Sequence, residues 1–214
     1  MKSVCSLAFA LAITALIPAR AANPHEGHPT TATQGYPLRG VVTQVLPEKK
    51  LVLIKHEEIP GFMKAMTMAF RVPEEIFSHL TPGTPVAAIL LPRQADGWHL
   101  ATVRILAQAG APLTAGVPYR LTLTQAEGLG FTAAYTFTPT ATGDWRVCVS
   151  TRAAWVDLVP PGGQPAASKA CTHANPEGFA KGPLYELTAN LPYELRLPKA
   201  PSAELDVLIV PFQP

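Results

Sequence analysis

The sequence predicts an all-β protein made of a small five-stranded barrel followed by a β-sandwich or jelly roll. The chain contains 23 prolines and 15 glycines among 214 residues. These residues separate short runs that are rich in Val, Leu and Thr, which is the pattern of strands joined by turns. No long helix is expected, although residues 73–80 are predicted to form one or two helical turns.

The first 21 residues have the features of a secretory signal peptide. Lys2 supplies the charge, Leu7 to Ile17 form a short apolar core, and Ala19-Arg20-Ala21 is a small-x-small cleavage site before Ala22. We therefore expect the mature chain to be exported. No later run approaches the ~18 uncharged apolar residues of a membrane span, so no further membrane insertion is expected.

Residues 22–35 lack apolar periodicity and are predicted to be a disordered leader. This leader contains His25 and His28, and short histidine tracts sometimes bind metal. The leader therefore has two interpretations. The two histidines form a weak secondary metal site, or they are solvated side chains near a free terminus.

Residues 36–108 contain five strand-like runs separated by turn signals. A proline-containing turn at 47–50 follows the first run, and Ala95-Asp96-Gly97 is a hairpin signal before the last. Five short strands in about 70 residues favour a closed or nearly closed barrel, for which the OB-type barrel is the common solution. The predicted strands are Leu38 to Leu46, Leu51 to His56, Met66 to Val72, Val86 to Leu91 and Trp98 to Leu106.

All methionines other than the initiator lie within six residues, at Met63, Met66 and Met68. Met66 and Met68 share one face of a predicted strand, and His56 ends the strand before it. Thioether and imidazole ligands suit Cu(I) and its heavier analogue Ag(I). The alternative is that the methionines only fill the core, but that interpretation does not explain why a histidine should meet the pair.

The methionine cluster lies in the run His56-Glu57-Glu58-Ile59-Pro60-Gly61-Phe62-Met63-Lys64-Ala65-Met66-Thr67-Met68-Ala69-Phe70. This run resembles the signature of the CusF family of periplasmic copper and silver chaperones. The resemblance covers residues 36–108 and implies a small OB-like barrel, a periplasmic location and metal binding by one histidine and two methionines. Carried over to this sequence, His56, Met66 and Met68 would be the ligands.

The sequence departs from the family at one position of the site. Founding members of the family carry a tryptophan three residues before the first motif methionine, where it caps the metal through a cation-π contact. This chain has Met63 there. Met63 could complete a four-coordinate site, or Phe62 could turn inward as an aromatic lid. We favour Met63 as a ligand.

Beyond a linker at residues 109–112, residues 113–214 are predicted to form the sandwich, whose family is not recognised. Cys148 and Cys171 are the only cysteines after signal removal, and an exported chain with two cysteines is expected to join them in a disulfide. The competing interpretation makes Cys171 and His173 metal ligands. Trp145 and Trp155 are expected in the core. The predicted strands are 118–124, 132–138, 144–150, 154–159, 184–187, 193–197 and 205–210.

The composition and motifs favour a binding protein over an enzyme. A net charge of +2 with 15% charged residues gives no basic face for nucleic acid, and no catalytic motif is present. We expect a monomeric metallochaperone or metal buffer that passes copper or silver to an efflux pump or another exported copper protein. Two other interpretations stay open, an adhesive or carbohydrate-binding sandwich with the barrel as passenger, and an assembly factor for a copper enzyme.

Overall fold

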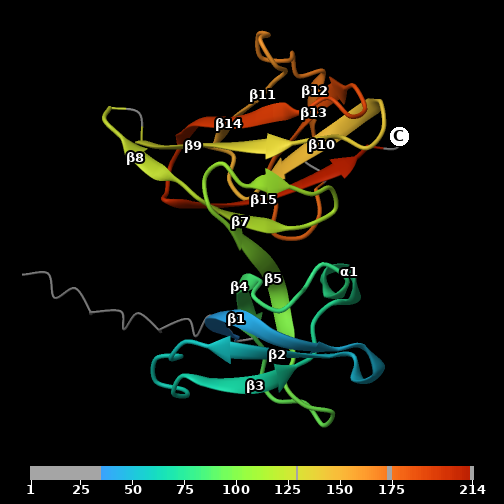
Figure 1. Cartoon of the computed structure of the whole chain (residues 1–214). Helices are drawn as coiled ribbons and strands as arrows, with labels where there is room; N and C mark the ends of the chain where they lie inside the picture. The colour runs from blue at the N-terminus through green and yellow to red at the C-terminus, as the bar shows by residue number, and fades with distance from the viewer. Residues whose placement is uncertain (1–34, 129, 173–174, 213–214) are drawn as a thin grey trace, which may run out of the picture. The chain divides into compact units, whose positions relative to one another are not determined.

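The computed structural model of the protein describes residues 35–128, 130–172 and 175–212. The predicted signal peptide, the leader histidines His25 and His28, and His173 lie outside these residues. Nearly all regular structure in the described part of the chain is β-strand, which confirms the all-β prediction (Figure 1). The exceptions are the 3-10 turn η1 (Pro47–Lys49) and the single-turn helix α1 (Glu74–Phe77). No helix among the described residues has the length and apolar character needed to cross a membrane.

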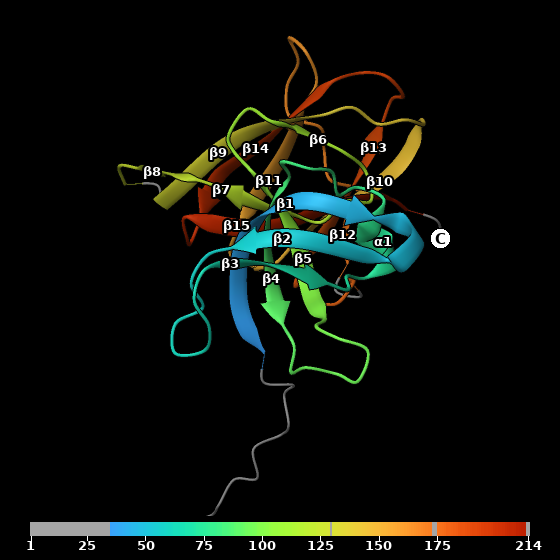
Figure 2. The same ribbon diagram turned by 60° about the horizontal axis from the view of Figure 1, so that its bottom comes forward.

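Five antiparallel strands in the first half are arranged in the order β5-β4-β1-β2-β3 (Figure 2). The two ends of this order are linked because the Arg71 N–H donates to the Trp98 carbonyl at 2.8 Å and the Leu100 N–H donates to the Arg71 carbonyl at 2.8 Å. The five strands therefore form a nearly closed sheet. They are β1 (Tyr36–Leu46), β2 (Leu51–His56), β3 (Met66–Phe70), β4 (Pro85–Leu90) and β5 (Leu100–Ala107).

Alternation along β2 and β3 decides which side chains face the core of this sheet. Val52, Ile54 and Phe70 are fully buried, whereas Lys55 and Ala69 are exposed. Side chains two residues apart in a strand point to the same face. His56 therefore continues the buried face of β2, and it is itself buried.

Strand β5 connects the first half of the chain to the second. Its pairing with β4 shifts register by one residue near Thr102, which has a φ of 51°. Such a bulge bends a strand and increases its twist. Beyond the bulge, Ile105 to Ala107 pair in parallel with β7 (Tyr119–Thr122). Hydrogen bonding between strands is thus continuous across the predicted linker, and the division into two domains there stays a prediction.

The strands of the second half lie in two sheets with one buried core between them. Phe137 and Trp145, from different sheets, pack edge to face with ring centroids 5.3 Å apart. The Tyr185 hydroxyl donates to the Val156 carbonyl of the other sheet at 2.7 Å. The first is part of a ten-stranded sheet that continues beyond β5 through β7, β15 (Glu204–Pro211), β10 (Gly143–Val149), β13 (Gly182–Leu187) and β12 (Ala170–Thr172). The second contains β11 (Trp155–Val159), β14 (Tyr193–Ala200), β9 (Gly130–Phe137) and β6 (Pro112–Leu113), with β8 (Thr124–Ala126) paired to β9.

One of the two tryptophans expected in the core is exposed. Trp145 is buried as predicted, but 60% of Trp155 is accessible to solvent. The register between β11 and β14 shifts just after Trp155, and such an irregularity changes the direction of a side chain. The Trp155 indole N–H donates to Asp157 Oδ1 at 3.0 Å, and Lys181 Nζ lies 5.8 Å from the ring centroid.

The predicted disulfide between Cys148 and Cys171 is absent, and both residues are free thiols. Cys148 lies in β10 and Cys171 in β12, and β13 lies between these strands. Two interstrand spacings separate the cysteines by about 9–10 Å, beyond the ~7 Å limit for Cα atoms joined by a disulfide. The prediction was wrong because sequence spacing does not show an intervening strand.

The two thiols are expected to differ in reactivity. Cys171 is exposed, whereas Cys148 is buried, and burial raises the pKa of the Cys148 thiol to about 11. Because the thiolate is the reactive form, iodoacetamide should add one label to the folded mature protein and two to the unfolded protein, without prior reduction, as measured by intact mass. Labelling that requires a reductant in denaturant would show that a disulfide forms after all.

Candidate metal centre

His56 has one ring nitrogen that is available for a ligand. The side chain is 1% exposed, and Nδ1 lies 2.7 Å from the Glu57 carbonyl oxygen. Because a carbonyl oxygen can only accept a hydrogen bond, Nδ1 carries the proton and Nε2 has a free lone pair. Nε2 has no hydrogen-bond partner among the described residues. A buried polar atom without a partner is unusual, and a backbone-oriented imidazole of this kind is how proteins prepare a histidine for metal.

Strand pairing brings the thioethers to this imidazole. His56 is directly opposite Met66, and Ile54 is opposite Met68, so all three candidate ligands lie on one face of the β2–β3 pair. Directly opposite residues have Cβ atoms about 4.5–5.5 Å apart, and diagonal neighbours are about 7–8 Å apart. Both methionine side chains are long enough to bring sulfur near His56 Nε2. Met68 packs partly buried against the core, whereas Met66 is 46% exposed.

The loop between β2 and β3 positions Met63 and Phe62 differently. Ile59 and Met63 exchange two backbone hydrogen bonds of 2.9 and 3.1 Å, which closes the loop into a small hairpin. Met63 is partly buried and packs against the core. Phe62 stacks on Tyr36 with ring centroids 4.0 Å apart and meets Trp98 edge to face at 6.0 Å. These three rings form what we name the aromatic cluster.

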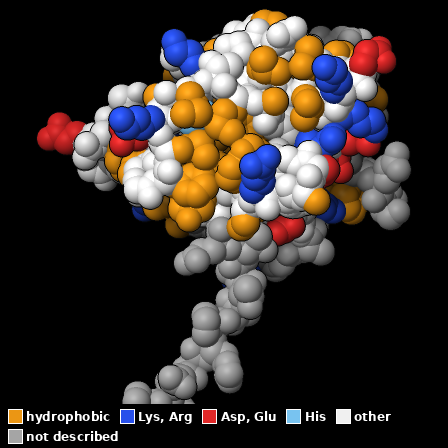
Figure 3. Space-filling model, turned by 90° about the horizontal axis from the view of Figure 1, so that it is seen from below, with side chains coloured by type: hydrophobic (Ala, Val, Ile, Leu, Met, Phe, Trp, Pro, Cys, Tyr) orange, Lys and Arg blue, Asp and Glu red, His pale blue; other side chains and the backbone are white. Residues whose placement is uncertain are grey.

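Figure 1 shows this loop beside the start of β1, where Tyr36 lies. The space-filling view in Figure 3 shows hydrophobic side chains gathered on the face seen from below, with Lys and Arg side chains among them. Tyr36, Phe62 and Met66 belong to the large hydrophobic side chains that solvent reaches. The candidate centre therefore has a buried side at His56 and a solvent-accessible side at Met66.

Sequence reasoning missed Gly40, which supports His56 from the neighbouring strand. Gly40 of β1 pairs with His56, and a Cβ atom at Gly40 would lie 2.8 Å from His56 Cα and 2.6 Å from the Lys55 carbonyl oxygen. Only glycine permits β1 to approach this closely. A single glycine inside an otherwise apolar strand pattern is the available signal, because it often marks close approach of another backbone.

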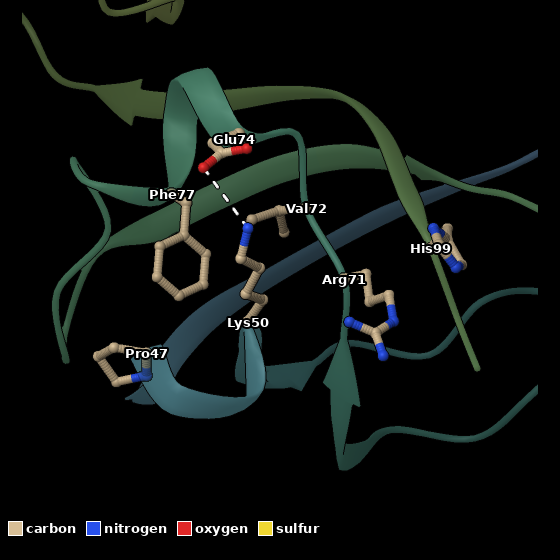
Figure 4. Close-up of a pocket in the computed structure, with 7 residues that line it drawn as sticks. All are labelled: Pro47, Lys50, Arg71, Val72, Glu74, Phe77 and His99. Atoms are coloured by element: carbon tan, nitrogen blue, oxygen red, sulfur yellow. Dashed lines mark ion pairs between the residues drawn. The ribbon is translucent and has the colours of Figure 1, made fainter. Parts of the chain in front are cut away.

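A pocket of about 430 Å³ lies at the other end of β2 and β3 (Figure 4). Its cations are paired with carboxylates: Lys50 Nζ lies 3.6 Å from Glu74, and Arg71 Nε lies 2.9 Å from Asp96. A hydrogen bond with His99 at 2.8 Å, aided by the charge of Arg71, lowers the pKa of Asp96. No thioether lines this pocket. It is lined by Pro47, Lys50, Arg71, Val72, Glu74, Phe77 and His99.

Harder metal ligands do not gather elsewhere in the part of the chain that the structure describes. No group of three or more His, Cys, Asp or Glu side chains is placed to hold a metal ion there. Glu57 and Glu58, which follow His56 directly, are both exposed. His56 and the thioethers therefore remain the candidate metal centre among the described residues.

The sequence profile of a known family matches this part of the chain. The family is described as copper binding periplasmic protein CusF, and the match spans residues 35–97. Residues 35–97 form a CusF-family region. This region contains His56, Met63, Met66 and Met68 and ends before β5, so the match does not extend to the second half.

A solved structure of apo-CusF from Escherichia coli, residues 6–88, also matches. The identity is 26%, the alignment covers 34% of this chain and 87% of that chain, and the TM-score is 0.30. Among curated proteins, none matched the sequence. The CusF-family assignment thus rests on the profile and applies to residues 35–97.

Proposed function

We propose that the protein binds Cu(I) or Ag(I) in the periplasm and acts as a metallochaperone or metal buffer. The observation that carries the proposal is the buried His56 Nε2, which lacks a hydrogen-bond partner among the described residues and lies opposite two methionines. The family description, a periplasmic copper-binding protein, supports the metal and the compartment. His56, Met66 and Met68 are the proposed ligands within the sheet.

Met63 is the proposed fourth ligand. Two backbone hydrogen bonds with Ile59 fix the position of Met63. The Met63 side chain is partly buried and packs against the core. Phe62, the alternative, has its ring in the aromatic cluster. One imidazole and three thioethers make a neutral, soft donor set, which favours a monovalent soft ion over Ca²⁺, Mg²⁺ or Mn²⁺.

Transfer of the ion requires no catalysis in this proposal. Thioethers have no proton to lose, and the Glu57 carbonyl oxygen orients the His56 ring, so ligands can exchange one at a time with those of an acceptor. Met66 is exposed, so an acceptor protein would first displace this ligand from the ion. We propose an efflux pump component or another exported copper protein as the acceptor.

The strand order of the first half supports an OB-like barrel, and the two sheets of the second half support a β-sandwich. We propose that the sandwich docks the acceptor or supports the barrel, and that the protein acts as a monomer. Hydrogen bonding between β5 and β7 connects the proposed metal-binding half to the sandwich. A partner bound to the sandwich would therefore be connected to the metal site through strand β5.

A competition titration with a monovalent copper chelator under reducing conditions tests the proposal. We expect the barrel site to bind one Cu(I) per chain, and Ag(I) to displace it, while Zn²⁺ and Ca²⁺ do not compete. X-ray absorption at the metal edge should show sulfur neighbours together with nitrogen. A spectrum with oxygen neighbours and no sulfur would refute the site.

A further inference from the structure

A second pocket, of about 580 Å³, is lined by residues of β5, β15 and the loop that joins β12 to β13. A pocket of this size can hold a small organic molecule. Most of its wall is apolar and comes from Pro118, Phe179, Leu208 and Val210. None of the residues that line it belongs to the candidate metal centre. The pocket is therefore a separate site.

Arg104 is the buried charge of this pocket. Its side chain is 8% exposed, and its Cζ atom lies 5.0 Å from the centroid of the Phe179 ring. Nε donates to Asp206 at 3.3 Å and Nη1 donates to the Val103 carbonyl at 3.2 Å, which leaves Nη2 without an acceptor among the described residues. A Cβ atom at Gly178 would lie 3.1 Å from Nη2. The missing side chain of Gly178 therefore keeps Nη2 open toward the pocket.

The ion pairs around Arg104 leave one positive charge in excess. Arg120 Nε donates to Asp206 Oδ1 at 2.7 Å, so two guanidinium groups share one carboxylate. The next carboxylate on the strand, Glu204, is paired with Arg39. Buried charges in proteins are normally paired. An anionic group bound at Arg104 would complete the pairing.

The opening of the pocket carries the opposite charge. Glu75 and Glu177 line the pocket and are exposed, whereas Arg104 is buried. Positive charge therefore lies at the inner end of the pocket and negative charge at its opening, with the apolar wall between them. A ligand carboxylate would accept a charge-assisted hydrogen bond from Nη2, and a ligand ammonium group would be attracted by the two glutamates.

We propose that this pocket binds a free α-amino acid with an apolar side chain. The ligand carboxylate accepts from Arg104 Nη2, the ammonium group faces Glu75 and Glu177, and the side chain packs on Phe179 and Leu208. A simple organic anion fits less well, because the acidic opening repels a ligand that has only negative charge. The inference does not depend on the proposed copper site.

Calorimetric titration of the metal-free mature protein with L-leucine tests the proposal. Leucinamide lacks the carboxylate and should bind at least roughly tenfold more weakly, because it loses a charge-assisted hydrogen bond. 4-Methylpentanoate lacks the ammonium group and should bind about two- to fivefold more weakly, because the glutamates are exposed.

Two variants assign these effects to residues. Arg104→Met should weaken L-leucine binding at least roughly tenfold. It leaves Arg120 paired with Asp206, so no buried charge loses its partner and the variant should fold. Glu177→Gln should weaken L-leucine about two- to fivefold and should not weaken 4-methylpentanoate. Glu127→Gln removes an exposed carboxylate away from the pocket and should change neither.

Three results would overturn the inference. The first is that L-leucine at millimolar concentration gives no binding heat with the parent protein. The second is that folded Arg104→Met binds L-leucine with parent affinity. The third is that 4-methylpentanoate binds at least as tightly as L-leucine, which would show a site for simple carboxylates. Each result leaves copper binding at His56 untouched, because the titrations contain no metal.

Discussion

Replacing Met66 and Met68 together with leucine is expected to lower the affinity for Cu(I) by more than about 100-fold. Loss of groups that only orient a metal ligand already costs about 10–100-fold, and this variant loses two proposed ligands. Leucine keeps the apolar volume, so the exchange should cost little stability. A competition titration with a monovalent copper chelator measures the effect.

Thr67 provides the matched control for this variant. It lies between the two methionines in β3, but its side chain is exposed on the opposite face of the strand. Thr67→Ala should therefore leave the affinity unchanged. If the double methionine variant also bound Cu(I) with parent affinity, β3 would not hold the metal, whatever the role of His56.

Replacing Asp206 with asparagine should destabilise the protein by about 3–5 kcal/mol. Asp206 accepts from Arg104 Nε at 3.3 Å and from Arg120 Nε at 2.7 Å. The Arg104 and Asp206 side chains are only 8% and 11% exposed, and burial lowers the pKa of Arg104, which Asp206 opposes. The variant leaves two guanidinium groups without this counter-charge. Urea unfolding of the metal-free protein measures the loss.

Glu204 gives a control on the same strand. It accepts from Arg39 at 2.6 Å, but these side chains are 42% and 40% exposed. Exposed pairs contribute about 0–1 kcal/mol, so Glu204→Gln should lower the free energy of unfolding by less than about 1 kcal/mol. Equal effects of the two variants would show that burial of Arg104 is not what makes Asp206 important.

The Asp206 contacts also join the two halves of the chain. Arg104 belongs to β5, Arg120 to β7 and Asp206 to β15. Strand β5 belongs to the first half of the chain, and β7 and β15 belong to the second half. Removing the shared carboxylate should therefore weaken the connection between β5 of the first half and β7 and β15 of the second.

Short-range patterns made much of the fold predictable. Turn residues and alternating apolar positions placed the five strands of the first half within a few residues, and β2 was placed at its observed bounds. All seven strands predicted in the second half are present, whereas β6, β8 and β12, of two or three residues each, were not predicted. Such short strands exist because a neighbouring strand pairs with them, and no local pattern marks them.

The sequence by itself determined that Met66 and Met68 share one face of a strand and that His56 ends the strand before it, because side chains in a strand alternate with a period of two residues. The pairing of β2 with β3 then put all three on one face. The sequence also determined the soft character of the donors, which is a property of the residue types. Three features came only from the tertiary structure. Strand β13 lies between Cys148 and Cys171, and Gly40 is paired with His56. Trp155 is exposed next to a register shift between β11 and β14. The tertiary structure also shows that His56 Nε2 is buried and has no hydrogen bond to another described residue. These features depend on which strands become neighbours, and pairing between residues far apart in the chain is not encoded in local periodicity.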